Sequence, residues 1–181
     1  MNKVFIIFCC SLLLLTACDT STKNETAGTG TDSSALANNS EESKEERNKQ
    51  NAMESVRAIN NNNPDEALKS FDADAIDYFD GSGPAMKGLD SIKAGVKMWM
   101  NNMEGYKGEN LEAFDDGNKV LVYGEWSGTF KGDFMGMKVA GKKFKVKDVD
   151  IFKFNEQGKI TEHRSVQSMA GLMASTEPGK K

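Results

Sequence analysis

The chain has 181 residues, of which 23 are lysine or arginine and 27 are aspartate or glutamate, and its formal net charge is −4. A mildly acidic chain lacks the basic footprint that nucleic-acid binding requires, so we expect no nucleic-acid partner. The length suits one globular domain behind the N-terminal segments, and the sequence contains no internal repeat.

The chain begins with a short apolar segment. Residues 4–15 form an apolar run of 12 residues behind Lys3, whereas a membrane span needs about 20. The sequence Leu-Thr-Ala-Cys at residues 15–18 resembles the lipobox of bacterial lipoprotein signals. Residues 1–17 are therefore predicted to be a lipoprotein signal peptide and Cys18 the lipidated residue. An ordinary secretory signal with an incidental cysteine is the alternative.

The lipobox predicts where the protein acts. Bacterial lipoproteins carry more than one acyl chain, such as palmitate, on this cysteine, and two chains give stable anchoring. We expect an extracytoplasmic, lipid-anchored protein of the cell envelope, with the bilayer as its partner through Cys18. Loss of residues 1–17 removes Lys3, Cys9 and Cys10, leaving 22 basic and 27 acidic residues and a net charge of −5. The mature chain would then have no free thiol, disulfide or cysteine cluster.

Residues 18–45 are predicted to form the lipidated cysteine and a flexible stalk. Ser, Thr, Asn, Gly, Ala and Glu dominate from Asp19 to Lys44, with one leucine and no aromatic residue. Such a segment buries too little apolar surface to offset its ordering entropy. A random coil of this length reaches roughly 30 Å, which would hold the domain clear of the lipid.

Two helices are predicted before the first strand. Ser43 and Glu46 have the spacing of a capping box, ahead of apolar residues at helical spacing. Residues 63–66 (Asn-Pro-Asp-Glu) supply a cap residue, a proline at the first helical position and acids in the first turn of a short second helix. A strand from Ala73 to Asp80 then ends in a loop rich in glycine.

The rest of the chain is predicted to be one helix followed by antiparallel sheet. Apolar residues recur at helical spacing from Leu89 to Met103. Alternating strands separated by turn residues follow, running to Phe114 and then over residues 120–130, 144–154 and 160–167. Helices gathered on one side of a curved antiparallel sheet predict an α+β fold.

Four short sequences, together with the order of elements, carry a family resemblance. They are residues 63–68 (Asn-Pro-Asp-Glu-Ala-Leu), 88–92 (Gly-Leu-Asp-Ser-Ile), 149–154 (Val-Asp-Ile-Phe-Lys-Phe) and 158–163 (Gly-Lys-Ile-Thr-Glu-His). With this order they resemble a SnoaL-like domain of the nuclear transport factor 2-like superfamily, over residues 46–175, leaving 176–181 as a C-terminal tail. The resemblance implies a cone, in which a bent sheet wraps around the N-terminal helices and leaves an apolar cavity at the open end.

The same resemblance leaves the activity open. Its members include polyketide cyclases, ketosteroid isomerase, epoxide hydrolase, scytalone dehydratase and many non-catalytic binding or assembly domains. Fold alone does not choose among these functions. The strand that carries the histidine departs from the SnoaL-like cyclases, because Arg164, Ser165 and Ser168 stand where acids and an aromatic residue are typical.

Two residues are candidates for proton transfer. His163 is the only histidine in the chain, and alternation places it on one strand face with Thr161, Ser165 and Gln167, a face that the resemblance turns toward the cavity. Asp150 shares a strand face with aromatic side chains, and burial of a carboxyl group among such rings raises its pKa. A hydrogen-bonded histidine of the cavity wall and a simply paired carboxylate are the structural alternatives.

The predicted ligand contacts are aromatic residues and a methionine. They are Tyr78, Trp99, Met103, Trp126, Phe134 and Phe152. Asp77 and Tyr78 lie on opposite faces of their strand, so at most one of them can share a cavity with Asp150.

These observations favour a non-catalytic domain that binds a small apolar or amphipathic molecule in the cone. The alternatives are an isomerase, cyclase or dehydratase that uses Asp150 and His163, and an assembly module that forms a homodimer. With one histidine and no cysteine cluster, we expect no metal site and no cofactor.

Overall fold

The computed structural model describes residues 33–176, with side chains from residue 43 onward. The predicted signal peptide, Cys18 and residues 177–181 of the predicted tail lie outside this part of the chain. Within it, no helix has both the length and the apolar character needed to cross a membrane.

The first helix, α1, runs from Ser33 to Asn60. It passes through Ser43, so the prediction that Ser43 caps its start is wrong, and residues 33–45 are helical instead of a flexible stalk. Residues 41–47 (Glu-Glu-Ser-Lys-Glu-Glu-Arg) are mostly straight-chain helix formers, which lose little rotamer freedom in a helix. A segment can therefore be polar enough to suggest disorder and still lengthen a helix at its N-terminal end.

Six strands form one curved sheet in the order β2-β1-β6-β5-β4-β3. The strands are β1 (Phe71–Asp77), β2 (Met86–Lys87), β3 (Met103–Asp116), β4 (Lys119–Phe130), β5 (Lys143–Phe154) and β6 (Ile160–Ser165). Neighbouring strands are antiparallel except β1 and β6, which are parallel. The parallel pair places the first strand of the domain directly beside the last.

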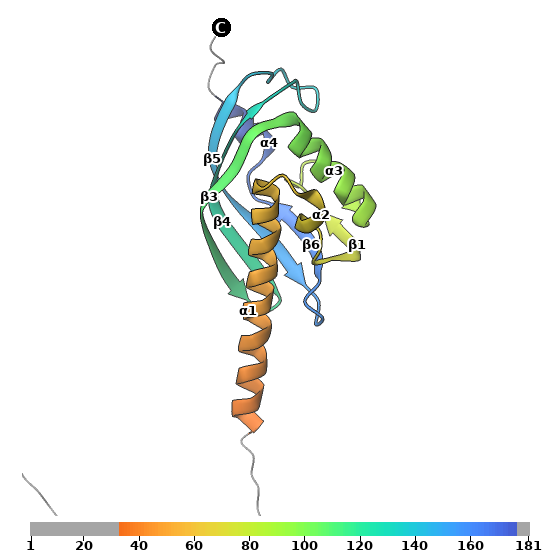
Figure 1. The fold of residues 1–181 in the computed structure, drawn as a ribbon, viewed down its shortest axis with the longest axis vertical. Coiled ribbons are helices and arrows are strands. Elements are labelled where there is room, and N and C mark those ends of the chain that lie inside the picture. Colours follow the sequence, from red (N-terminus) through yellow and green to blue (C-terminus); the bar gives the residue numbers. More distant parts are fainter. Residues whose placement is uncertain (1–32, 177–181) are drawn as a thin grey trace, which may run out of the picture. The chain divides into compact units, whose positions relative to one another are not determined.

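Three further helices accompany the sheet. They are α2 (Pro64–Ala67), α3 (Leu89–Asn102) and α4 (Met169–Ala174). The sheet curves around the C-terminal half of α1, and α2 and α3 lie on the same side of it (Figure 1). The structure thus confirms the predicted α+β fold, while α4 and the two-residue strand β2 were not predicted.

Local hydrogen bonds explain how two of the helices are held. The Asn63 side chain accepts a hydrogen bond from the Glu66 backbone N–H at 3.2 Å, which confirms the predicted start of α2. At the end of α1, the Asn60 side chain donates to the Gly108 carbonyl at 2.9 Å and accepts from the Gly108 N–H at 2.7 Å. This reciprocal pair fixes α1 against strand β3.

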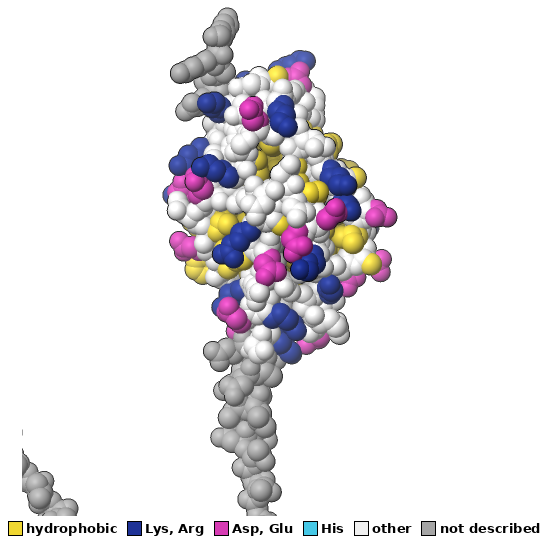
Figure 2. Space-filling view, viewed as in Figure 1, with side chains coloured by type: hydrophobic (Ala, Val, Ile, Leu, Met, Phe, Trp, Pro, Cys, Tyr) yellow, Lys and Arg dark blue, Asp and Glu magenta, His cyan; other side chains and the backbone are white. Residues whose placement is uncertain are grey.

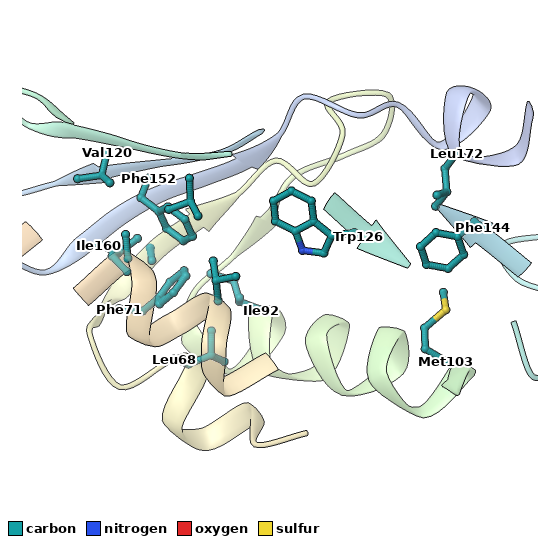
Figure 3. Packing of buried hydrophobic residues seen from close by; sticks show 14 of the residues in the cluster. Leu68, Phe71, Ile92, Met103, Val120, Trp126, Phe144, Phe152, Ile160 and Leu172 are labelled. Atoms are coloured by element: carbon teal, nitrogen blue, oxygen red, sulfur yellow. The ribbon is translucent and has the colours of Figure 1, made fainter. Parts of the chain in front are cut away.

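The apolar core fills the space between helices and sheet. In Figure 3, Phe71, Ile92 and Ile160 lie at one end of the cluster and Phe144 and Leu172 at the other. Basic and acidic side chains are intermixed over the face shown in Figure 2, with no patch of a single sign. The cohesion of this domain therefore comes mainly from the buried apolar cluster.

Candidate functional site

A cavity of about 160 Å³ lies between the inner face of the sheet and helices α1, α3 and α4. That volume is similar to an apolar cavity known to hold one benzene molecule, about 150 Å³. Seven aromatic side chains of Phe, Tyr and Trp are among its lining residues. These rings are Phe71, Phe79, Trp99, Tyr106, Trp126, Phe144 and Phe152. The cavity therefore suits a compact organic molecule of about one ring.

Strand alternation brings polar groups into one part of this apolar wall. On β5 the inward positions carry Asp148 and Asp150, and on β6 they carry His163 and Ser165. Antiparallel pairing sets Asp150 opposite Ser165 and places His163 opposite Phe152, whose ring lies 4.8 Å from the imidazole. The predicted inward face of each strand is the one that lines the cavity.

The parallel pairing of β1 with β6 adds a third carboxylate, because Asp77 lies in register with His163. His163 Nδ1 is 3.1 Å from Asp77 Oδ1, and His163 Nε2 is 3.4 Å from Asp150 Oδ1. The Asp77 side chain is only 6% exposed and that of His163 19%. Both ring nitrogens thus face carboxylates, the arrangement that a doubly protonated imidazolium satisfies by donating to each.

The electrostatics of this triad favour the charged form of His163. Burial alone would lower the pKa of His163, but the attraction of Asp77 and the hydrogen bonds with Asp150 and Asp77 outweigh burial and raise that pKa to about 10. Burial opposes ionisation of Asp77 as well, yet the charge of His163 and hydrogen bonds from His163 and the Phe79 N–H leave the pKa of Asp77 lowered. His163 is therefore an imidazolium at neutral pH and cannot serve as a base there.

For Asp148 and Tyr106, in contrast, the surroundings favour the neutral form of the side chain. Burial, reinforced by the nearby charge of Asp150, raises the pKa of Asp148, although Asp148 accepts hydrogen bonds from Ser165 Oγ at 2.5 Å and from the Gln167 N–H at 2.7 Å. Burial also raises the pKa of Tyr106 well above 10, and the charges of Asp150 and Asp148 act in the same direction. The Tyr106 phenol therefore stays protonated and can act only as a neutral hydrogen-bonding group.

Asp150 is the carboxylate best placed to meet a ligand. Its hydrogen-bond donor within residues 33–176 is His163, which approaches one of its two oxygens. The side chain lines the cavity and is 16% exposed. A carboxylate oriented by an imidazolium, with acceptor capacity left over and apolar surroundings, is suited to take a proton from a bound molecule.

The structure brings together some of the predicted site residues and separates others. Asp150 and His163 meet as described, and Trp99, Trp126 and Phe152 line the cavity. Three predicted ligand contacts need correction, because they are absent from the cavity lining. They are Tyr78, Met103 and Phe134.

Each correction has a physical reason. Tyr78 lies on the strand face opposite Asp77, where its ring sits 5.4 Å from the guanidinium carbon of Arg164. Met103 and Phe134 belong to the part of the apolar core outside the cavity lining, where Phe134 packs its ring edgewise on Trp99 at 5.5 Å. Of the pair that alternation left open, Asp77 is the one that reaches the cavity.

The cavity residues Asp77, Tyr106 and Asp148 were not predicted as site residues. Tyr106 falls at the start of a glycine-rich stretch, which obscures its strand alternation, while Asp148 shares the alternation of Asp150 and could have been found from it.

Within the described residues, no group of three or more histidine, cysteine, aspartate or glutamate side chains is arranged to hold a metal ion.

Comparison with known proteins places this chain in a family. No curated protein matches the chain. A candidate polyketide cyclase from Xanthomonas campestris has a similar structure, with a TM-score of 0.65 and 16% identity over 73% of this chain and 98% of that protein. A candidate SnoaL-like polyketide cyclase from Jannaschia gives a TM-score of 0.64 and 18% identity over 72% of this chain and 92% of that one. The family model for SnoaL-like polyketide cyclases matches residues 50–176, and the chain therefore belongs to this family.

Proposed function

We propose that this protein is a lipid-anchored, extracytoplasmic domain that binds a small organic molecule in its cone and transfers a proton on it, as isomerases, cyclases and dehydratases do. The observation that carries the proposal is the Asp77–His163–Asp150 arrangement on the wall of an aromatic cavity. The tether rests on the lipobox that ends at Cys18.

In this proposal Asp150 is the base. Its carboxylate takes a proton from the bound molecule, while His163 holds that carboxylate in place and Asp77 keeps His163 charged. Asp150 then returns the proton to another atom of the same molecule, which restores the carboxylate. Tyr106 lies where a neutral hydroxyl could donate a hydrogen bond to an oxygen that gains charge during the reaction.

Binding without catalysis would use the same cavity, and the buried charges argue against it. Taking carboxylates and an imidazolium out of water costs several kcal/mol for each ion before their mutual attraction is counted. Holding an apolar molecule requires only the aromatic walls. A site that keeps this ionic triad beside its ligand is better explained by proton transfer.

Proton transfer can be tested without knowing the substrate. The protein is incubated in D₂O with a panel of small carbon acids, and deuterium uptake is followed by NMR. We expect catalysed exchange in at least one compound, lowered about 100-fold or more by Asp150→Asn. Glu109→Gln is the matched control, because Glu109 lies on β3 at the surface and pairs with Lys107 at 2.7 Å. Equal exchange by Asp150→Asn and the native protein, or no exchange with any compound, would contradict the proposal.

The tether is tested separately by fractionation of bacterial cells that express the full chain. We expect the native protein in the membrane fraction and Cys18→Ser in a precursor or soluble form without lipid, because stable anchoring needs the acyl chains on this cysteine. Labelling with a palmitate analogue should mark only the native protein. An unchanged distribution, with label on both proteins or on neither, would show that Cys18 is not the anchor.

A further inference from the structure

The ionisable groups of the cavity are unequal in number. Four aspartates and one histidine line it, and among the described residues no lysine or arginine does. The aspartates are Asp77, Asp80, Asp148 and Asp150. One imidazolium therefore faces several carboxylates within a small enclosed volume.

Two of these carboxylates are already matched within the protein. Asp77 pairs with His163. Asp80 accepts hydrogen bonds from the N–H of Ser82 at 3.0 Å and from the N–H of Met169, the first residue of α4, at 2.8 Å. Although burial opposes ionisation of Asp80, these hydrogen bonds leave the pKa of Asp80 lowered, so its charge is already stabilised without a ligand.

Asp148 and Asp150 are different, because their acidic charge exceeds what surrounds them. They stand two residues apart on the same face of β5, and of the two it is Asp150 that contacts the imidazolium of His163, which Asp77 also contacts. The hydrogen bonds that reach Asp148 come from the hydroxyl of Ser165 and from backbone amides, which carry no net charge. This part of the wall keeps an excess of negative potential directed at the cavity.

The aromatic rings around the cavity act in the same direction. The faces of Trp, Tyr and Phe rings carry the negative part of a quadrupole and attract cations, with Trp the strongest of the three. Trp99 and Trp126 both line the cavity, together with Tyr106 and Phe144. Carboxylates and aromatic rings together form the surroundings in which a quaternary or protonated amine is bound, and they repel an anion.

We propose that the natural ligand of this cavity is a small organic cation, a substituted ammonium of about the size of one ring or a trimethylammonium group. Its charge lies beside Asp148 and Asp150, and its alkyl groups contact Trp99, Trp126 and Phe144. This inference rests on the proposed function, since it assigns the charge of the molecule bound at the same site. It excludes carboxylate and phosphate ligands.

Two probes of nearly equal shape test the charge alone. Choline and 3,3-dimethyl-1-butanol differ in that a quaternary nitrogen of the first is a carbon atom in the second. Calorimetric titration of the purified full-length protein should show choline binding at least about tenfold more tightly than the alcohol, a difference of roughly 1.4 kcal/mol. Asp148→Asn and Asp150→Asn should each weaken choline about tenfold and leave the alcohol unchanged, while Glu109→Gln should change neither.

Equal or tighter binding of the alcohol overturns the inference, and so does the absence of choline binding. The comparison of the two probes on the native protein needs no variant, so it holds even if one of the substitutions impairs folding. Deuterium exchange on neutral carbon acids without choline binding would retain the catalytic proposal and reject the cation. Choline binding without exchange on any compound would retain the cation and reject the catalytic proposal.

Discussion

Asp77→Asn is expected to lower the free energy of unfolding at pH 7 by about 3 kcal/mol, because it leaves a buried imidazolium without its main counter-charge. Asp77 is only 5% exposed, and its carboxylate is 3.1 Å from His163. The asparagine keeps the shape of the side chain and an acceptor for the Phe79 N–H, which Asp77 binds at 2.7 Å. The loss therefore measures the charge and not a cavity.

Urea unfolding at pH 7 gives this quantity directly. Asp74→Asn is the matched control, because Asp74 lies on the same strand, is exposed and should change stability by no more than about 0.5 kcal/mol. A loss below about 1 kcal/mol for Asp77→Asn would mean that His163 is neutral in the folded protein.

The second large effect is a fall in stability between neutral and alkaline pH. The folded pKa of His163 is about 10, against 6.5 for an unperturbed histidine. A group whose folded pKa is raised contributes its full stabilisation below pH 6.5 and loses it as the pH rises toward 10. The loss amounts to roughly 3 to 5 kcal/mol at 1.36 kcal/mol for each pKa unit. Asp77 has a lowered pKa, so its contribution is complete above pH 3.8 and is lost at lower pH.

The comparison that isolates His163 is the difference in unfolding free energy between the native protein and His163→Gln at pH 6, 8 and 10. Lysines and tyrosines titrate in both proteins and cancel. We expect the difference to be largest at pH 6 and to shrink steadily toward pH 10. A difference that stays constant, or grows with pH, would contradict a raised histidine pKa.

Much of this fold follows from patterns in the sequence. The helical spacing from Leu89 and the glycine-marked turns between the later strands predict α3 and β3 to β6, because amphipathic period and turn chemistry are local properties. The start of α1 and the existence of α4 depend less on the local sequence pattern. α4 is short and contains Gly171, and it is held partly by Asp80, whose carboxylate accepts from the Met169 N–H at 2.8 Å across a long separation in sequence.

The site was partly predictable for the same reason. Alternation within β5 and β6 turns Asp150 and His163 toward one face without any knowledge of the neighbouring strands. Asp77 could not be assigned in this way, because its contact with His163 depends on the parallel pairing of β1 with β6, between segments far apart in the chain. Met103 and Phe134 fit a ligand wall equally well by composition, since core packing and ligand contact require the same apolar side chains.

The most direct test is the NMR titration of His163, which is the single histidine in the chain and needs no assignment. The ring nitrogen and carbon shifts of the folded protein, followed from pH 5 to 10, report its protonation. If Asp77 and Asp150 hold an imidazolium at the cavity wall, the shifts will stay those of the charged ring through pH 8 and change only as the pH nears 10. A transition centred near pH 6.5 would show an ordinary histidine and would remove the physical basis of the proposed site.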